Sequence, residues 1–410
     1  MVKNADALER EVERQFALIG EGTLEVITAD DLRAKLRRSV AAGEPLKVKL
    51  GADPTAPDIH LGHTVVLDKL RDFQRLGHQV IFVIGDFTGR IGDPSGRSKT
   101  RPALSPDEVR ANAATYADQV FKILDPARTV IEYNSRWSDP MTFADVIRLA
   151  AKYTLARMLE RDDFGRRLEE GAPVGLHELL YPLAQAYDSV ALAADVELGA
   201  SDQRFNLMVA REIQREYGQE PEVAVILPLL VGTDGALKMS KSLDNYIGIA
   251  EPPDEIYGKL MSVADPLMYD YLATLRLQTT EELTRLRDEV AAGRRHPKAV
   301  KQEMARRLVA RYYDEAAANA AEAAFERVHR EHRAPEDMAA FTLPTPAMKV
   351  VDIVVAAGLA PSKSEARRLV AQHAVTLDGE VVADGDAPRT FAGGEVLKVG
   401  KRRFVRLALR

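Results

Sequence analysis

Two short segments carry side chains that could bind phosphate groups. The first is HLGH, in which His60 and His63 lie three residues apart around Gly62. The second is KMSKS, which places Lys238 and Lys241 three residues apart. Imidazole and ammonium groups both donate hydrogen bonds to phosphate oxygens. Together the segments predict a site for a nucleoside triphosphate, although each alone would also fit a polar surface loop.

The first segment lies between a predicted strand and a predicted helix. PLKVKLGA predicts a strand that ends at Gly51, and apolar residues spaced by three and four after His63 predict a helix that stops at Gly77. The apolar run VIFVIG then predicts a strand buried on both faces. A strand, a helix and a strand form a βαβ unit of a parallel sheet. Ligands of such sheets bind at the carboxyl ends of the strands, beside helix N-termini.

Three polar side chains share one face of a predicted helix further along the chain. Tyr181, Gln185 and Asp188 are spaced i, i+4 and i+7 in the apolar segment HELLYPLAQAYDSVALAADV. A buried carboxylate and a buried amide both need hydrogen-bond partners. The neighbouring leucines argue against a face turned to solvent. We therefore expect a pocket for a ligand that carries both a hydroxyl and an ammonium group.

The bulk composition predicts a globular protein of several domains. The 410 residues are too many for one core, and 46% hydrophobic with 29% charged residues is ordinary for such proteins. No apolar run approaches the ~20 residues that a membrane span needs. The chain has no cysteine. This excludes disulfides and thiolate zinc sites, and it suits the reducing cytoplasm.

The residue pattern divides the chain into four parts. Residues 1–247 are expected to form an α/β domain, a Rossmann-like doubly wound parallel sheet, with only helices in the first 45 residues or so. Residues 248–330 show helical periodicity. Residues 331–348 contain three prolines and predict a linker. Residues 349–410 predict a small α+β domain.

The last part carries signals for RNA binding. Ser362 and Glu365 predict a capping box, after which Arg367 and Arg368 project from the exposed side of a helix, and VTLDGEVV predicts a hairpin. From residue 349 onward there are eleven Lys and Arg against seven Asp and Glu, a local charge of +4, whereas the whole chain carries −6. Such a basic surface can bind phosphates, or it can be an ordinary solvated face.

The two phosphate-binding segments resemble the HIGH and KMSKS signatures of class I aminoacyl-tRNA synthetases. KMSKS matches letter for letter, and HLGH departs only at Leu61. LLYPLAQAYDS, ELGASDQRFN and FTGRIGDPSGRSKTR resemble the amino-acid pocket of the tyrosyl-tRNA synthetases. The helix with adjacent arginines and the hairpin resemble an RNA-binding module first described in a small-subunit ribosomal protein. The resemblance covers nearly the whole chain and is weakest between about residues 265 and 345.

The resemblance implies an enzyme that joins L-tyrosine to ATP as tyrosyl-adenylate. The tyrosine then passes to the terminal ribose of tRNA(Tyr). The carboxylate of tyrosine is itself the nucleophile, so the enzyme needs to position it and to stabilise charge rather than to supply a general base. ATP would bring Mg²⁺, with no metal held tightly by the protein. The resemblance further implies a homodimer in the cytoplasm without membrane contact.

The implied roles fall on positions that match the family's motifs. The residues expected to act in catalysis are Thr55, His60, His63, Arg97, Arg101, Lys238 and Lys241. Those expected to bind tyrosine are Gly51, Asp93, Tyr181, Gln185, Asp188 and Gln203, with Asp188 at the phenol hydroxyl and Tyr181, Gln185 and Asp93 at the ammonium group. Those expected to bind ATP are Asp53, Gly62, Asp202, Lys238 and Lys241, although both aspartates would also fit turns or caps. Those expected to bind RNA are Lys363, Arg367, Arg368, Lys401, Arg402 and Arg403.

Two positions depart from the family pattern, and three other functions stay open. Lys49 stands where many members have a tyrosine that contacts the substrate hydroxyl, so recognition would depend more on Asp188. Arg97 stands where many members have lysine. The other functions are a tryptophanyl-type synthetase, an enzyme that adenylates a small acid, and an RNA-binding factor on an inactive synthetase scaffold. The C-terminal module argues against the first two, and the two intact motifs argue against the third.

Overall fold

The computed structural model describes most of the chain. The described residues are 2–54, 58–94, 105–330, 338–400 and 403–409. They form two compact units, Met1–Asp314 and Glu315–Arg410, and each unit is considered by itself. The four-part division expected from the sequence stays a prediction.

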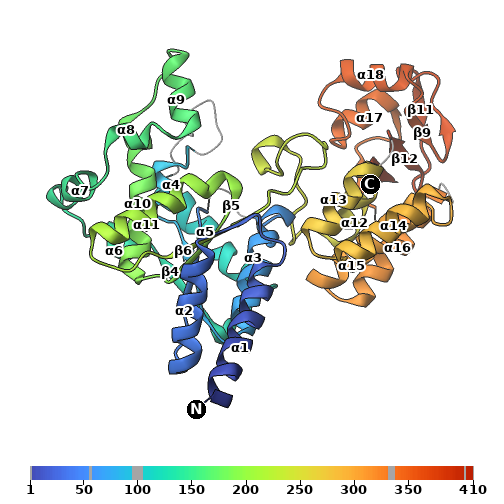
Figure 1. Ribbon diagram of the computed structural model, residues 1–410. Helices are drawn as coiled ribbons and strands as arrows, with labels where there is room; N and C mark the ends of the chain where they lie inside the picture. The colour runs from blue at the N-terminus through green and yellow to red at the C-terminus, as the bar shows by residue number, and fades with distance from the viewer. Residues whose placement is uncertain (1, 55–57, 95–104, 331–337, 401–402, 410) are drawn as a thin grey trace. The chain divides into compact units, whose positions relative to one another are not determined.

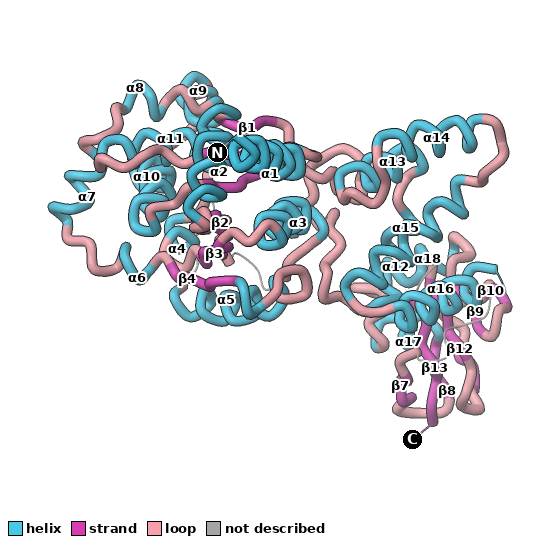
Figure 2. Tube along the Cα trace, turned by 60° about the horizontal axis from the view of Figure 1, so that its bottom comes forward, coloured by secondary structure: helices cyan, strands magenta, loops and turns pink. Residues whose placement is uncertain are grey.

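A six-stranded sheet forms the centre of the first unit. Its order is β1-β6-β5-β2-β3-β4, and Figure 2 shows β2, β3 and β4 side by side. The strands are β1 (Glu25–Ile27), β2 (Lys47–Ala52), β3 (Gln79–Ile84), β4 (Thr129–Tyr133), β5 (Val196–Ala200) and β6 (Val223–Leu227). From β2 to β6 all neighbours are parallel. The chain runs outward from β2 in one direction and from β5 in the other, so the sheet is doubly wound with its switch point between β2 and β5.

The edge strand β1 corrects one expectation. The sequence predicts only helices in the first 45 residues, but β1 pairs antiparallel with β6, Val26 opposite Val225. The sheet is therefore mixed and mostly parallel rather than wholly parallel. A three-residue strand is too short to show a period, and its partner lies far away in the sequence.

Fifteen α-helices of the described residues belong to the first unit. They are α1 (Val2–Gly20), α2 (Ala29–Ala42), α3 (Leu61–Arg75), α4 (Thr88–Ile91), α5 (Pro106–Val120), α6 (Ser135–Ser138), α7 (Phe143–Ala150), α8 (Leu155–Met158), α9 (Asp162–Glu169), α10 (Leu176–Leu192), α11 (Arg204–Glu216), α12 (Pro253–Ser262), α13 (Asp265–Thr274), α14 (Thr280–Ala291) and α15 (Pro297–Tyr312). Helix α3 packs on β2 and β3, and α11 packs on β5 and β6. The predicted helix stop at Gly77 is confirmed, because α3 ends beside this residue, whose φ is +92°.

The start of α10 is held by a buried ion pair. Arg167 Nη1 lies 2.7 Å from Glu178 Oε2, and both side chains are almost fully buried. Glu178 also accepts a hydrogen bond from the backbone N–H of Gly175, just before the helix. The helix then runs alongside α11, as Figure 1 shows, and the contact buries Leu183 and Ala186. On the polar face of α10, Gln185 donates to Glu197 of β5, so this face also reaches the sheet.

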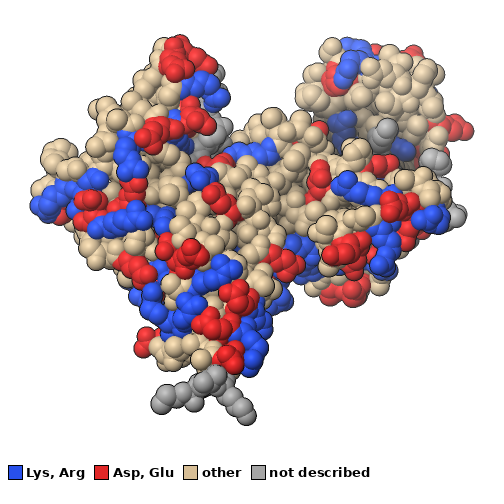
Figure 3. All heavy atoms as spheres, viewed as in Figure 1, with Lys and Arg blue, Asp and Glu red and all other residues tan. Residues whose placement is uncertain are grey.

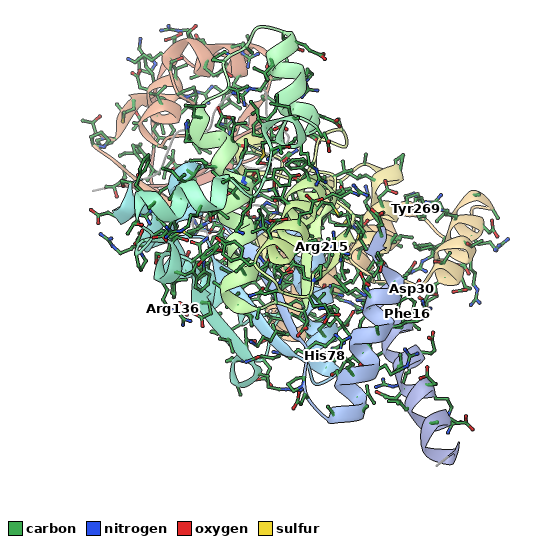
Figure 4. All side chains as sticks on the ribbon, turned by 60° about the vertical axis from the view of Figure 1, so that its left-hand side comes forward. Phe16, Asp30, His78, Arg136, Arg215 and Tyr269 are labelled. Atoms are coloured by element: carbon green, nitrogen blue, oxygen red, sulfur yellow. The ribbon has the colours of Figure 1, made fainter. Side chains whose placement is uncertain are left out.

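The first two helices of the chain form a packed pair. Helices α1 and α2 pack together, with the guanidinium of Arg33 centred 3.6 Å from the ring of Phe16. Figure 4 labels Phe16 on α1 and Asp30 in the first turn of α2. Acidic residues at this helix start are favourable because the N-terminus of a helix carries partial positive charge. Helix α2 ends at Gly43, whose φ of +69° lies in the left-handed region that favours glycine.

The second unit is a small α+β assembly. Its helices and strands are α16 (Glu315–Arg330), β7 (Ala340–Leu343), β8 (Ala347–Lys349), α17 (Val350–Ala356), α18 (Lys363–Ala371), β9 (Val375–Leu377), β10 (Glu380–Val381), β11 (Pro388–Thr390), β12 (Val396–Val399) and β13 (Arg403–Leu409). The larger sheet has the order β10-β9-β12-β13-β7, and β11 pairs with β8. Asp378 and Gly379 have positive φ in the β9–β10 turn, which confirms the predicted hairpin.

Strands β7 and β8 lie largely within residues 331–348, for which the sequence predicted a linker and no strand. β7 pairs in parallel with β13, Leu343 opposite Leu409, and Leu343 is buried. Pairing between segments this far apart leaves no local periodicity for the sequence to reveal.

One of the two hydrogen bonds of the predicted capping box at the start of α18 is present. Ser362 accepts from the backbone N–H of Glu365, but the Glu365 carboxylate binds Arg368 instead of returning to the cap.

The surface has no large region of one charge in the view of Figure 3. Lys and Arg lie interspersed with Asp and Glu over the face shown there. Among the described residues no helix is long and apolar enough to cross a membrane.

Candidate active site

A cavity of about 640 Å³ opens where the carboxyl ends of β2 and β5 meet. Gly51 and Ala52 line it from the end of β2, and Gly199 and Ala200 line it from the end of β5. This is the switch point of the doubly wound sheet, where neighbouring connections leave in opposite directions and open a crevice. A side chain at Gly51 would meet no atom within 4 Å and would project into open space, so glycine leaves this edge of the cavity free.

The two histidines form a stacked pair at the start of α3. His60 is the N-cap residue, and its Nδ1 accepts a hydrogen bond from the backbone N–H of Gly62 at 3.1 Å. The Nδ1 of His63 accepts in turn from the backbone N–H of His60 at 3.2 Å. The ring centroids lie 3.8 Å apart, and both rings line the cavity. A Cβ at Gly62 would lie 3.0 Å from the His60 ring, so glycine leaves room for the ring over the helix start.

These contacts determine the protonation of both rings. Burial, together with the neighbouring His63 and Lys241, lowers the pKa of His60 far below its ordinary value. Burial and Lys241 lower the pKa of His63 to about 3. Both rings are therefore neutral near pH 7, and since each Nδ1 accepts a hydrogen bond, the single proton of each ring sits on Nε2. The pair supplies two Nε2–H donors, not two cations.

The KMSKS segment is folded over the same cavity. The side chain of Asn245 accepts from the backbone N–H of Ser240 and donates to Asp234, which closes the loop. Gly235 has a φ of +73° in its tight turn, a conformation that favours glycine. Lys238 and Lys241 both line the cavity.

The two lysines have different surroundings. Lys238 Nζ lies 2.6 Å from a carboxylate oxygen of Asp202, the residue expected to contact the adenylate. Lys241 Nζ lies 5.5 Å from the centre of the Tyr116 ring. The cationic and neutral donors expected from two remote segments thus converge on one cavity. Thr55, Arg97 and Arg101, which were expected to join them, lie outside the described residues.

Asp188 also lines the cavity and is buried. Its carboxylate accepts hydrogen bonds from Nε1 of Trp137 at 2.7 Å and from Nδ2 of Asn134 at 3.3 Å. Burial raises the pKa of Asp188 to about 6, although Lys49 and these two donors oppose the shift. The carboxylate is thus mostly ionised at pH 7 and can accept a further hydrogen bond from a hydroxyl in the cavity.

The remaining predicted pocket residues form a connected polar wall. Tyr181 donates to Asp53 Oδ2 at 2.9 Å, and Gln203 donates to Asp93 Oδ2 at 2.8 Å. Gln185 lies one turn after Tyr181 on α10, and all five side chains line the cavity. Asp53 also accepts from Thr88, so this side chain, which is expected to bind ATP, is oriented by two donors.

Several residues of this wall were missed by the sequence reasoning. Asn134 and Trp137 hold Asp188, while Glu197 and Asn206 contact Gln185. Only one carried a visible signal, because Trp137 is the single tryptophan of the chain. The others are ordinary polar residues whose importance depends on burial.

In the second unit the expected RNA-binding residues are mostly paired with acids. Arg367 pairs with Asp386 at 2.7 Å, Arg368 with Glu365 at 2.6 Å, and Lys363 with Asp352 at 2.7 Å. Their side chains are well exposed. Arg403 instead donates to the backbone carbonyl of Leu359, which indicates a structural role. Lys401 and Arg402 lie outside the described residues.

Comparison with known protein families identifies the family of the chain. Residues 41–330 match the family of class I tRNA synthetases (W and Y), and residues 331–405 match the SYY-like C-terminal domain of tyrosine–tRNA ligases. The chain belongs to the class I tRNA synthetases of this tryptophan and tyrosine group. A tyrosine–tRNA ligase of Moorella thermoacetica is 56% identical over 98% of this chain and 97% of its own length. One of Desulfotalea psychrophila is 52% identical over 97% and 98%. Within the family the chain therefore belongs with the tyrosine–tRNA ligases.

Solved structures show the same fold at lower identity. A tyrosyl-tRNA synthetase of Archaeoglobus fulgidus, crystallised with L-tyrosine, superposes with a TM-score of 0.61 at 24% identity, covering 76% of this chain and 99% of that one. One from Aeropyrum pernix gives 0.60 at 23% identity, over 77% and 99%. These structures support the Rossmann-like fold predicted from the sequence.

Proposed function

We propose that the chain is a tyrosine–tRNA ligase and that the cavity beside β2 and β5 is where it activates tyrosine with ATP. One observation supports this most strongly. The HLGH histidines, the KMSKS lysines and the buried Asp188 line the same cavity. Donors for phosphate thus lie beside an acceptor for a hydroxyl, as the joining of tyrosine to ATP requires.

In the first step the tyrosine carboxylate attacks the α-phosphorus of ATP and pyrophosphate leaves. The products are tyrosyl-adenylate and pyrophosphate. Nε2–H groups of His60 and His63 donate to phosphate oxygens as negative charge develops, and Lys238 and Lys241 stabilise the departing pyrophosphate. Preorganised donors of this kind need little rearrangement during the reaction, because the stacked rings are already held by the start of α3. Lys238 must exchange its Asp202 partner for phosphate when ATP binds.

Mg²⁺ enters this scheme with ATP. Among the described residues no group of three or more His, Asp or Glu side chains could hold a metal ion. Mg²⁺ commonly binds through substrate phosphates and water with few protein ligands. We propose that the ion binds through the ATP phosphates.

Tyrosine is selected at the Asp188 end. The phenol hydroxyl donates to the ionised carboxylate, whose other hydrogen bonds come from Trp137 and Asn134. A phenylalanine would leave this buried acceptor without its third partner, which is costly in a site closed to water. The ammonium group lies against Tyr181, Gln185 and Asp93.

The direct test is ATP–pyrophosphate exchange with each amino acid in turn. Exchange with tyrosine alone is the expected result. Exchange with tryptophan and not with tyrosine would replace the proposal by the tryptophanyl alternative. No exchange with any amino acid, from a folded protein that binds tRNA, would favour the non-catalytic alternative.

Tyrosine affinity should depend on pH through Asp188. The free protein has a pKa near 6 at this residue, and the phenol donates best to the ionised form. Above about pH 7 the carboxylate is already ionised, so Kd stays constant. Below pH 6 the bound proton must first be released, so Kd rises by up to about tenfold per pH unit. The two active-site histidines do not contribute, because their pKa values are about 3 or lower.

Equilibrium dialysis of L-tyrosine between pH 5 and pH 8 measures this dependence. The Asp188→Asn variant keeps an oxygen that can accept from Trp137 but cannot titrate, so its Kd should be weaker and independent of pH. An unmodified protein whose Kd is the same at pH 5 and pH 8 would contradict the role of Asp188.

In the second step the terminal ribose of tRNA attacks the adenylate, and we propose that the exposed basic residues of the second unit bind that tRNA. Surface ion pairs such as Arg368–Glu365 contribute little to stability, so the arginine can exchange its partner for phosphate. Each of Arg367→Gln and Arg368→Gln should reduce the slope of log Kd for tRNA against log salt by about one. Filter binding at several salt concentrations measures the slope.

Arg14→Gln provides a matched control for this experiment. Arg14 forms an ion pair with Glu11 at 2.6 Å, also three residues apart, but on α1. Its loss should leave the salt slope unchanged. A slope that changes equally in all three variants would show a general charge effect and would reject the second unit as the binding surface.

A second copy of the chain is the partner we propose for an exposed apolar surface on the first unit. Phe143 and Leu176 are each 81% exposed, and Ile147 and Leu155 are also exposed. Phe143 and Ile147 lie one turn apart on α7, and exposed apolar side chains that lie together mark an interaction surface. Sedimentation of the unmodified protein should show a dimer that Phe143→Glu converts to a monomer, and an unmodified monomer would contradict the assignment.

A further inference from the structure

A buried ion pair lies behind the amino-acid end of the cavity. Lys49 on β2 and Glu197 on β5 are paired across the parallel strands, with Nζ 3.0 Å from Oε1. Each side chain is only 1% exposed. Burying two charges costs more in lost hydration than it returns unless further hydrogen bonds are made, so such a pair is weak evidence for stability alone. The additional contacts of Glu197 indicate a second role of the pair, the orientation of Gln185.

Glu197 is the acceptor that orients Gln185. Nε2 of Gln185 donates to Glu197 at 3.2 Å, and the hydroxyl of Ser189 donates to it at 3.4 Å. The neighbouring Glu222 is fully buried, and burial beside Glu197 raises the pKa of Glu222 well above its ordinary value. Burial thus favours the protonated form of Glu222, while the contact with Lys49 lowers the pKa of Glu197 and favours its ionised form.

A second residue orients the same carboxamide from its other side. Nδ2 of Asn206 donates to Oε1 of Gln185 at 3.0 Å and to Oε1 of Gln203 at 2.9 Å. Nε2 of Gln203 in turn donates a hydrogen bond to Oδ2 of Asp93 at 2.8 Å. If Gln185 flipped, its NH₂ would face the Asn206 donor and its oxygen would face the Glu197 carboxylate. Both contacts would be repulsive, so only one orientation is allowed.

We propose that Glu197, neutralised by Lys49, is a positioning residue that turns the Gln185 carboxamide so that its oxygen accepts from the substrate's ammonium group. The inference rests on the proposed function, since it names how that site holds one end of tyrosine. It also changes the expectation for position 49. The family tyrosine there contacts the hydroxyl, whereas Lys49 acts through Glu197 on the ammonium end.

Two double variants test this role without leaving an unpaired buried charge. Lys49→Met with Glu197→Gln removes both charges but keeps an oxygen that can accept from Gln185. Lys49→Met with Glu197→Leu removes both charges and the acceptor. The probes are L-tyrosine and 3-(4-hydroxyphenyl)propanoate, which has the phenol and carboxylate but no ammonium group. Fluorescence of the single tryptophan, Trp137, reports binding of both, because its Nε1 contacts Asp188 at the phenol end.

The expected result depends on the ligand. The Leu variant should bind L-tyrosine about tenfold more weakly than the Gln variant, the loss of one oriented hydrogen bond to a charged group. The two variants should bind the propanoate equally, within about twofold, because it places nothing against Gln185. A loss of the same size for both ligands would overturn the proposal and place the effect at the phenol end. Equal tyrosine affinities in the two variants would also overturn it.

Two further variants keep the test decisive. Asn206→Ala removes the donor on the other side of the same carboxamide and should give the same tyrosine-selective loss, even if the Leu variant fails to fold. Lys69→Met removes another buried lysine, whose partner Asp72 lies 3.3 Å away, and should change the affinity for neither ligand. An unmodified protein that binds neither ligand would refute the proposed function itself. Binding of both without discrimination among the variants would refute only this inference.

Discussion

Replacing His60 by asparagine is expected to lower the rate constant for adenylate formation by about 100- to 1,000-fold, the usual effect of removing one preorganised donor. The Kd for tyrosine should stay within about twofold, because His60 lines the phosphate end of the cavity and not the Asp188 end. Pre-steady-state measurement of adenylate formation separates the two quantities. An unchanged rate constant would contradict the role assigned to this histidine.

Asparagine is chosen because His60 has two separate tasks. Its Nδ1 caps α3 by accepting from the backbone N–H of Gly62, and its Nε2–H is the donor that we propose for phosphate. The Asn oxygen occupies the place of Nδ1, and Asn is a favoured N-cap residue, so the helix start is kept. His60→Ala removes both tasks and should in addition lower the free energy of unfolding by about 1 kcal/mol. If both variants lost stability and rate together, the rate effect would be attributed to a disturbed helix start.

Lys238→Met and Lys241→Met are each expected to lower the same rate constant by about 100-fold or more. Both ammonium groups line the cavity at the phosphate end, and the pyrophosphate gains charge as it leaves. The double variant should lose less than the product of the two single effects, because groups that act on one leaving group work as a unit. Methionine keeps most of the apolar stem, so packing is little changed.

Lys259→Met is the matched control for the two lysines. Lys259 pairs with Glu251 at 2.7 Å and lies over the ring of Tyr246 on the neighbouring chain segment. Its loss should leave the rate constant within about twofold. Rate constants that fall equally in all three variants would indicate a general effect of charge rather than contact with pyrophosphate. Tyrosine affinity, measured in parallel, should not change in any of them.

Local sequence patterns were sufficient to predict the structural features that form between residues close together in the chain. The helix start at His60, the stop at Gly77 and the hairpin around Asp378 were predicted from spacing and turn residues, and the structure confirms them. The polar face of α10 was predicted in the same way, from Tyr181, Gln185 and Asp188. Such features depend on residues a few positions apart, so they can be predicted from the spacing of apolar and polar residues.

Pairings between segments far apart in the chain could not be predicted from local sequence patterns. The short strands β1 and β7 were missed because each is defined only by its partner, β6 or β13. The Lys238–Asp202 contact and the partners of Asp188 were missed for the same reason.

The sequence by itself determined the HLGH and KMSKS motifs, the helix that carries Asp188, and the family. The tertiary structure alone decided that Lys49 pairs with Glu197, which accepts from Gln185, and that both histidines are neutral. The physical reason is that charge state and amide orientation depend on burial and on donors from other strands and helices. Neither quantity can be obtained from the order of residues along one segment.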